Sequence, residues 1–374
     1  MKKYILIATT FATSLTFANS QKDLSFSGSC ESSNRATISF VGDILVHKAI
    51  YKSVAKGSKD FSTIWNAVNP MIQKADFSVA NLEGAAALGI DSNGRDKGDV
   101  GFIYDGKVYS GTNFVFNYHP KIAKDLKKSG YDLISFANNH SMDRFSLGVD
   151  KTLEALHEAD LITSGARKTY EDESKLYSVV NIEGINVAFV ACTESLNGRS
   201  DKENQILNCN NGSVEKIVKK LKESSEVDFI TVMPHWGIEY KTEPSGSQKM
   251  LARKFAEAGA GAVIGSHPHV PQPWEKYITS KGEEALFVYS LGNFVAFQKG
   301  LNNKTGPIVY LNLVKDLDNK AKISGVAYSL TQRQGYYVLP VGKNAKSFVN
   351  NGKKFYGAKS FLLPEEPLAK ILCD

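Results

Sequence analysis

Residues 262–269 read Ala-Val-Ile-Gly-Ser-His-Pro-His, an apolar strand that runs directly into two histidines. The same change from apolar residues to polar ligand types occurs at four other places: Phe40–Asp43, Val79–Glu83, Phe136–His140 and Val232–Gly237. In an open α/β sheet, ligands bind outside the carboxyl ends of the strands. These endings are therefore expected to converge on one crevice.

Apolar strands alternate with amphipathic helical stretches from about Ala36 to Phe297. The predicted strands are Thr37–Val41, Phe77–Ala80, Leu133–Ala137, Val187–Cys192, Phe229–Met233, Ala262–Gly265 and Leu286–Ser290. The predicted helices are Pro120–Ser129, Leu147–Ala159, Val214–Glu223 and Ser247–Ala258. This repeated β-α-β rhythm, with near-continuous apolar strands, predicts an α/β fold whose largely parallel sheet is covered on both faces.

Two stretches depart from this rhythm. Residues 88–117 are rich in Gly, Asn and Asp and are expected to form a long excursion near the site. After Gly306 the pattern changes to β-like runs separated by Asn, Lys and Gly turns. The expected organisation is an N-terminal segment over residues 21–35, a main domain over residues 36–300, and a small C-terminal β-rich extension over residues 301–374 packed on this core.

The first twenty residues have the features of a secretory signal peptide. Two lysines precede an uncharged, mostly apolar run that ends in Ala18-Asn19-Ser20, so the mature chain is expected to begin at Gln21. An uncleaved membrane anchor is the alternative, although the run is shorter than the roughly 20 residues of a spanning helix. No transmembrane helix is expected in the mature chain. The predicted location is the periplasm or the cell surface.

Charge and cysteine content narrow the function further. Without the two leader lysines, 43 basic side chains face 39 acidic ones, and no basic stretch is interleaved with aromatic residues, so no nucleic-acid partner is expected. The four cysteines allow disulfides in an exported chain. The preferred pairs are Cys192–Cys209 and Cys30–Cys373, and the other pairings stay open. There is also no Walker motif, serine-hydrolase elbow or dinucleotide fingerprint.

The residue types at the strand ends suit a two-cation hydrolytic site. In an extended segment, residues i and i+2 point the same way, so His267 and His269 can reach one site. Gly42 before Asp43 permits close approach of the backbone. The amide oxygen of Asn139 can coordinate a hard cation. A turn with solvated side chains is the structural alternative for each of these motifs.

Further groups complete this candidate site. His140 is the candidate general acid, and Asp143 is close enough in sequence to orient its imidazole. Glu83 can bridge two cations with its two oxygens, and His235 adds another imidazole. Each of these residues could instead have a purely structural role, such as that of a capping residue or a solvated carboxylate. The candidate substrate contacts are Asn81, Glu239, Gln272 and Asn293.

The order of these motifs resembles the CapA family over roughly residues 36–297. The motifs are Gly42-Asp43, Asn81-Leu82-Glu83, Asn138-Asn139-His140 with Asp143, His235-Trp236-Gly237 with Glu239, His267-Pro268-His269 with Gln272, and Ser290–Phe294. CapA proteins are bacterial poly-gamma-glutamate capsule synthesis proteins whose fold is similar to calcineurin-like metallophosphoesterases. The resemblance implies a four-layer αββα sandwich with a dinuclear centre at the strand ends.

The resemblance also implies roles for the site residues. One cation would be held by Asn139, His235 and His267, the other by Asp43 and His269, with Glu83 as the bridge and His140 as the proton donor. The chain departs from the phosphoesterase pattern in two places. Leu45 stands where a histidine of an Asp-x-His motif is expected, and the bridge is Glu instead of Asp. His47 is a candidate substitute for the missing histidine.

The expected function is that of an exported, metal-dependent hydrolase of the cell envelope that serves capsule or poly-gamma-glutamate biosynthesis. It would use one or two divalent ions, of Mn, Zn or Fe. The expected partners are the capsule polymer or its precursor and other capsule export proteins. Two alternatives stay open: a non-catalytic polymer-binding or assembly protein that uses the same crevice, and an extracellular phosphodiesterase or nucleotidase.

Overall fold

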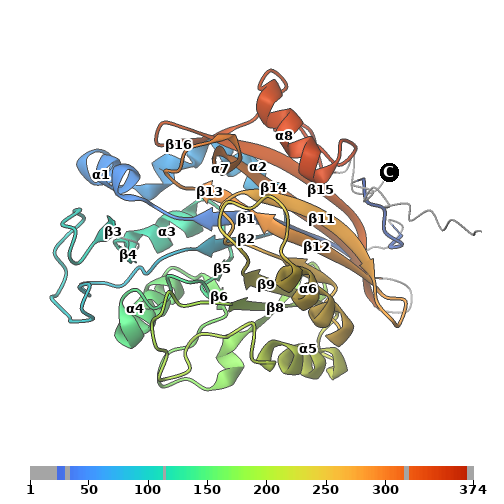
Figure 1. The fold of residues 1–374 in the computed structure, drawn as a ribbon, viewed down its shortest axis with the longest axis horizontal. Coiled ribbons are helices and arrows are strands. Elements are labelled where there is room, and N and C mark those ends of the chain that lie inside the picture. The colour runs from blue at the N-terminus through green and yellow to red at the C-terminus, as the bar shows by residue number, and fades with distance from the viewer. Residues whose placement is uncertain (1–22, 30–33, 113–114, 316–319, 369–374) are drawn as a thin grey trace, which may run out of the picture.

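Two β-sheets pack face to face and carry helices on both outer faces (Figure 1). The structure is a computed structural model that describes residues 23–29, 34–112, 115–315 and 320–368. The predicted signal peptide, Cys30 and Cys373 lie outside the described residues. Among the helices that are described, none combines the length and apolar character needed to cross a bilayer.

The first sheet combines parallel and antiparallel strands. Its order is β16 (Tyr337–Pro340), β15 (Ala321–Gln334), β14 (Thr305–Lys315), β1 (Arg35–Ile44), β2 (Phe77–Leu82), β5 (Leu133–Ser135) and β6 (Ile162–Ser164), with β13 (Asn293–Val295) also paired to β1. From β1 to β6 the neighbours are parallel, whereas β14 runs antiparallel to β1. The expected C-terminal β-rich region therefore supplies strands beside β1, and the domain boundary at residue 300 stays a prediction.

The second sheet has a parallel centre and antiparallel edges. Its order is β11 (Pro271–Ile278), β12 (Glu284–Leu291), β10 (Ala262–Ile264), β9 (Phe229–His235), β8 (Ile185–Thr193) and β7 (Ser178–Ile182). Only the edge strands β11 and β7 are antiparallel to their neighbours. The long excursion contains a separate small hairpin, β3 (Ser110–Thr112) and β4 (Val115–Asn117).

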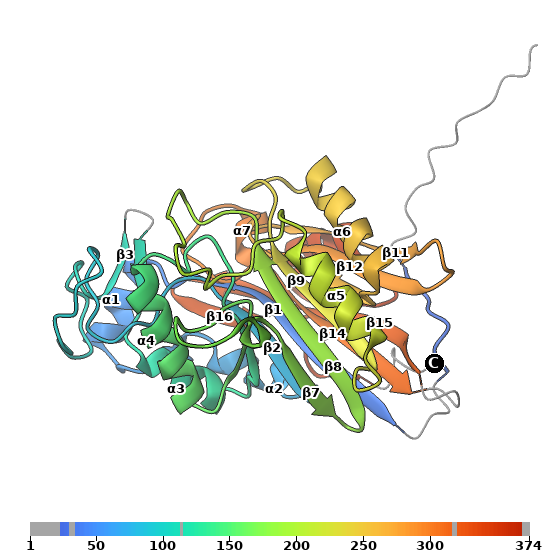
Figure 2. The same ribbon diagram turned by 90° about the horizontal axis from the view of Figure 1, so that it is seen from below.

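Helices complete the two outer layers. They are α1 (Lys48–Lys56), α2 (Asn69–Ile72), α3 (Lys121–Lys128), α4 (Phe145–Glu158), α5 (Ser213–Glu223), α6 (Gly246–Ala258), α7 (Leu301–Lys304) and α8 (Lys346–Tyr356), with 3-10 turns at Phe61–Ile64, Asn66–Val68 and Glu173–Leu176. Figure 2 shows α5 and α6 side by side on the second sheet. Helix α6 begins at a capping box, in which Ser245 and Gln248 satisfy each other's backbone N–H groups.

Side-chain alternation along the strands produces the layers. In β1, Ala36, Ile38 and Phe40 point into the core between the sheets. Val41 and Ile44, after a register shift, belong to the core under α1 and α3. A third core lies between the second sheet and the helices α5 and α6. These three apolar layers make the four-layer αββα sandwich, as expected.

All seven strands and four helices predicted from the apolar pattern are confirmed within a few residues. The single, largely parallel sheet expected from the rhythm alone is wrong, because the strands divide between two mixed sheets. An apolar strand reads the same whether helices or another sheet cover its face. The pattern therefore identifies the strands but does not assign them to a sheet.

Candidate metal centre

The candidate ligands lie at the carboxyl ends of strands from both sheets. Asp43 is the residue before the last in β1, where its Cα pairs with those of Asn81 in β2 and Asn293 in β13. A Cβ on Gly42 would lie 1.9 Å from the carbonyl oxygen of Gly292. The glycine before Asp43 is therefore required for the close approach of β1 to the turn before β13.

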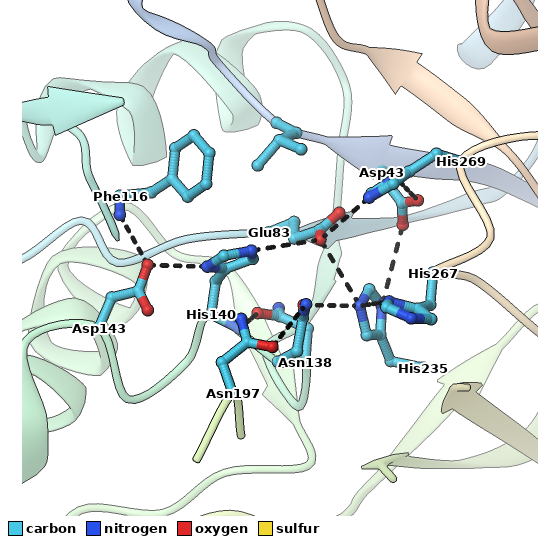
Figure 3. Close-up of polar contacts among 12 residues, drawn as sticks. Asp43, Glu83, Phe116, Asn138, His140, Asp143, Asn197, His235, His267 and His269 are labelled. Atoms are coloured by element: carbon cyan, nitrogen blue, oxygen red, sulfur yellow. Dashed lines mark hydrogen bonds and ion pairs between the residues drawn. The ribbon is translucent and has the colours of Figure 1, made fainter. Parts of the chain in front are cut away.

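Two groups of ligand atoms share the carboxylate of Glu83. One group contains Glu83, His235 and His267, the other contains Asp43, Glu83 and His269, and within each group the ligand atoms lie within 4.8 Å of one another. Figure 3 shows His235 and His269 directed at the Glu83 carboxylate. Its Oε1 lies 3.6 Å from His235 Nε2 and 3.8 Å from His269 Nε2. The sequence-predicted ligands are thus brought together.

The amide of Asn139 completes the first group. Its Oδ1 lies 2.9 Å from His235 Nε2, and His267 Nδ1 lies 3.1 Å from the same nitrogen. The other nitrogen of His235, Nδ1, is 2.9 Å from Ser266 Oγ. A hydrogen bond there fixes the ring and leaves Nε2 directed at the shared space.

The backbone at His267 and His269 is not extended. The expectation that an extended segment directs both side chains the same way is therefore wrong. His267 and His269 adopt φ values of 98° and 59°, in the left-handed region that non-glycine residues rarely occupy. Their ring centroids lie 5.9 Å apart, and each ring belongs to a different one of the two ligand groups. Such strain persists only where the surroundings impose it and is concentrated at functional sites.

Glu83 is the strongest indication of a bound cation. Its side chain is completely buried, and neither carboxylate oxygen has a hydrogen-bond partner among the residues that the structure describes. Burial raises the pKa of Glu83 well above its usual range. A buried carboxylate without donors is strongly unfavourable unless a positive charge compensates it. The donor set, of carboxylate, imidazole and amide groups, fits one or two divalent transition metals.

The histidines divide into two electrostatic classes. Burial lowers the pKa of His267 to about 4 and that of His235 well below its usual value, so both rings are neutral, as metal ligands must be. Burial also opposes protonation of His269. The nearby carboxylates of Glu83 and Asp43 outweigh it and raise the pKa of His269 to about 9.

His140 and Asp143 form the predicted acid pair. Asp143 Oδ2 lies 2.9 Å from His140 Nδ1 and also accepts a hydrogen bond from the backbone N–H of Phe116. His140 Nε2 faces the centre, 4.0 Å from Glu83 Oε1 (Figure 3). The Phe116 ring packs edge-on against the imidazole. The long excursion therefore helps to hold the general-acid candidate, through its strand β4.

The four candidate substrate contacts have different surroundings. Asn81 donates to Asp43 Oδ1 at 2.8 Å, so it supports a ligand. Glu239 lines a cleft beside His140. Gln272 is completely buried and donates to the carbonyl oxygen of Lys241. Asn293 donates to the carbonyl oxygen of His269 and helps to fix that strained segment.

His47 does not replace the histidine ligand that is missing at Leu45. Leu45 is buried, and no metal-type group among the described residues includes His47. His47 Nδ1 accepts a hydrogen bond from the backbone N–H of Phe297. Burial lowers its pKa to about 4. Among the described residues, the second group of candidate His and carboxylate ligands contains Asp43, Glu83 and His269.

Several site residues carried no recognisable sequence signal of their role. Asn138 donates to Leu82 O and Asn81 Oδ1, and Ser266 contacts His235 as described above. Asn197 and Arg199 come from a loop that is distant in sequence from the predicted ligands. They line a cleft beside His140, and this cleft has a volume of about 440 Å³. The predicted disulfide Cys192–Cys209 is confirmed, and it closes this loop. Only the disulfide prediction pointed to the loop.

Comparison with known proteins shows the family. The family described as "Bacterial capsule synthesis protein PGA_cap" matches residues 37–298. The chain belongs to this family. The capsule biosynthesis protein CapA of Bacillus anthracis is 28% identical over 284 residues, which cover 75% of this chain and 64% of that protein. The PGA biosynthesis protein CapA of Bacillus subtilis (strain 168) is 27% identical over 77% of this chain and 70% of its own length.

Among solved structures, the 5'-nucleotidase of Candida albicans SC5314 is similar with a TM-score of 0.39 and 14% identity. That similarity covers 86% of this chain and 55% of the other.

Proposed function

We propose that this member of the bacterial capsule synthesis family is a metal-dependent hydrolase of the cell envelope. The observation that carries the proposal is the shared, buried Glu83 carboxylate, which has no hydrogen-bond donor and lies between two groups of metal-type ligands. The proposed substrate is the capsule polymer or its precursor, and we take this polymer to be poly-gamma-glutamate because one relative is named a PGA biosynthesis protein. Other capsule export proteins are the proposed partners.

The proposed chemistry assigns a role to each side of the centre. Asn139, His235 and His267 would hold one divalent ion, Asp43 and His269 a second, and Glu83 would be common to both. Such ions, when bound, supply a water of lowered pKa and stabilise negative charge on the attacked phosphoryl or carbonyl group. His140 donates a proton to the leaving atom, and the Asp143 carboxylate holds its imidazole in the required tautomer and orientation.

Turnover tests this proposal directly. Purified protein, loaded in turn with Mn²⁺, Zn²⁺ and Fe²⁺, is assayed on an aryl phosphodiester, a nucleoside monophosphate and poly-gamma-glutamate. We expect hydrolysis of at least one probe and loss of about 100- to 10,000-fold of kcat in His140→Ala, the usual range for removing a general acid. The control is His157→Ala, in helix α4 away from the centre. Unchanged turnover in His140→Ala would contradict the assignment.

A non-catalytic, polymer-binding role is the second candidate. The buried Leu45, in place of a histidine ligand, favours it because the second ligand group is short of one imidazole. Metal-loaded protein that binds poly-gamma-glutamate but hydrolyses none of the three probes would support this role.

Export is part of the proposal. A cleaved leader and an oxidised Cys192–Cys209 pair both fit a compartment outside the cytoplasm. N-terminal sequencing of protein recovered from the producing cell is expected to begin at Gln21. Recovery of intact Met1 would contradict cleavage.

A further inference from the structure

The cleft beside His140 contains one positively charged side chain, Arg199, that has no role in the proposed chemistry. Its walls include Asn139, His140, Asp143, Asn197, Arg199 and Glu239. Arg199 is the only Lys or Arg among the residues that line it. Because His140 is the proposed proton donor, this cleft adjoins the side of the centre where the leaving group departs.

The guanidinium group of Arg199 is positioned by an aromatic ring and has no direct ion pair among the described residues, although Asp143 and Glu239 also line the cleft. It lies over the ring of Phe145, 4.6 Å from the ring centroid, in a cation–π contact. Phe145 itself has a φ of 57°, an unusual backbone conformation for an aromatic residue. No ion pair joins Arg199 to a carboxylate anywhere in the described part of the chain. Its planar donors are therefore available to a ligand in the cleft.

The neighbouring arginine does not share this role. Arg144 is completely buried, and its guanidinium donates to the backbone oxygens of Ile90, Asp143 and Val108 and to the hydroxyl of Ser110. These contacts use its donors inside the protein. Arg199 is thus the arginine of this region that faces the cleft.

The loop that carries Arg199 is fixed at both ends and along its length. The Cys192–Cys209 disulfide closes it, and Asn197 Oδ1 accepts from Asn139 Nδ2 at 3.4 Å. Figure 3 shows Asn197 directed toward the ligand cluster from this loop. An arginine held in this way loses less conformational freedom when it binds an anion, and its paired donors match an oxyanion in bidentate geometry.

We propose that Arg199 binds a carboxylate carried by the leaving group of the substrate, and so sets the substrate class. The proposal rests on the hydrolase function proposed above. In a γ-linked glutamate chain, the carbon bonded to the leaving nitrogen bears such a carboxylate. With His140 donating a proton to that nitrogen and Arg199 holding the adjacent carboxylate, the cleft distinguishes a γ-linked amino-acid chain from an amide or ester with an uncharged leaving group.

Matched probes isolate this contact. γ-Glutamylglycine and γ-glutamylmethylamide differ only in the carboxylate of the leaving amine. Two aryl methyl phosphates, one with a carboxylate on the aryl leaving group and one without, test the same preference on a phosphodiester. Each pair is assayed with the metal-loaded wild type, Arg199→Gln, Arg199→Lys, and the control Arg253→Gln in helix α6, outside the cleft.

The wild type is expected to prefer the carboxylated member of a pair, and Arg199→Gln is expected to lower that preference about 10- to 100-fold, mainly through KM. Turnover of the uncharged member and metal content are expected to stay unchanged. Arg199→Lys should retain part of the preference, and Arg253→Gln all of it. If only the phosphodiester pair responds, the anion contact stands but the γ-glutamyl assignment is overturned. A preference retained in Arg199→Gln overturns the proposal.

Failure of hydrolysis is separated from failure of this inference by a binding measurement. If the metal-loaded wild type turns over neither pair, the proposed hydrolase function has failed, and equilibrium binding of γ-glutamylglycine to wild type and Arg199→Gln decides the anion contact. Binding weakened about tenfold or more in Arg199→Gln supports the contact. Equal binding, or no binding to the wild type, overturns it.

Discussion

At the scale of single residues, Glu83 is the residue on which the proposed metal centre depends. A carboxylate that is fully buried without a donor is a poor choice for stability alone, since an apolar residue or a paired polar one would serve better. Its position between His235 and His269 is that expected for a carboxylate that binds a cation together with these rings. Asp43 differs from Glu83, because its carboxylate already receives a hydrogen bond from Asn81.

Glu83→Gln is expected to weaken binding of both ions, because the carboxylate belongs to both ligand groups. We expect a loss of metal affinity of more than about 100-fold, beyond the 10- to 100-fold typical of changes to residues behind the ligands. Isothermal titration with Mn²⁺ and Zn²⁺ measures it. Glu154→Gln on helix α4 is the matched control, and equal affinities in the two variants would show that Glu83 is not a ligand.

Metal binding is expected to strengthen as pH rises toward 9. The pKa of His269 is raised to about 9, so this ring holds a proton near neutral pH in the metal-free protein, and burial raises the pKa of Glu83 as well. Ligands must lose their protons before they bind a cation. Titration at pH 6, 7.5 and 9 should therefore show rising affinity, with protons released to the buffer. Affinity that is flat across this range would disagree with the assigned ligands.

The sequence indicated the candidate metal ligands better than the residues that hydrogen-bond to them or line the cleft beside them. Asp43, Asn139 and His235 stand where an apolar strand ends, a position that topology alone makes informative. Arg199 occupies an ordinary polar stretch, and Asn138 belongs to the Asn138-Asn139-His140 motif, which does not reveal the hydrogen bonds that Asn138 donates to Leu82 and Asn81. Their roles depend on which segments meet across the sandwich, which no local pattern encodes.

At the scale of elements, the loop between β8 and α5 contributes both to the stability of the fold and to the lining of the cleft. Cys192 and Cys209 are both buried, and their disulfide closes a loop with a sequence separation of 17 residues. A loop of this length corresponds to about 3 kcal/mol of stabilisation in the chain-entropy description. The loop also carries Asn197 and Arg199 to the cleft.

Replacing both cysteines by alanine is expected to lower the free energy of unfolding by about 3 kcal/mol, measured by chemical denaturation. The carboxylate preference assigned to Arg199 should fall with it, while metal content stays the same. The wild type under reducing conditions is the comparison. A double variant as stable as the oxidised wild type would show that the disulfide does not support the fold.

Element types could be predicted, whereas their assignment to sheets could not. The apolar runs of β8 and β9 identify them as buried strands. Nothing in those runs indicates that they form a sheet separate from β1 and β2. That division arises from long-range packing, in which Phe77 of one sheet stacks on Phe189 of the other.

At the scale of the whole molecule, the centre lies where the two sheets meet. Asp43, Glu83 and Asn139 follow strands of the first sheet, whereas His235, His267 and His269 come from the second. An ion held by such a set links the sheets. Its binding free energy therefore contributes to the stability of the whole fold.

Removing metal with a chelator is expected to lower stability by about 4 kcal/mol, the value for a single ion present at a thousand times its Kd. Scanning calorimetry with and without added metal measures it as a fall in Tm, and the fall should be much smaller in Glu83→Gln. A Tm that does not respond to the chelator or to added metal would mean that no ion links the sheets.

The most direct test of the central claim is elemental analysis of purified wild type and His267→Ala, with His157→Ala as control. We predict one or two divalent transition-metal ions per chain in the wild type and in the control, and a loss of bound metal in His267→Ala with an unchanged circular dichroism spectrum. A wild type without bound metal, or a His267→Ala variant that retains the full content, would contradict the account.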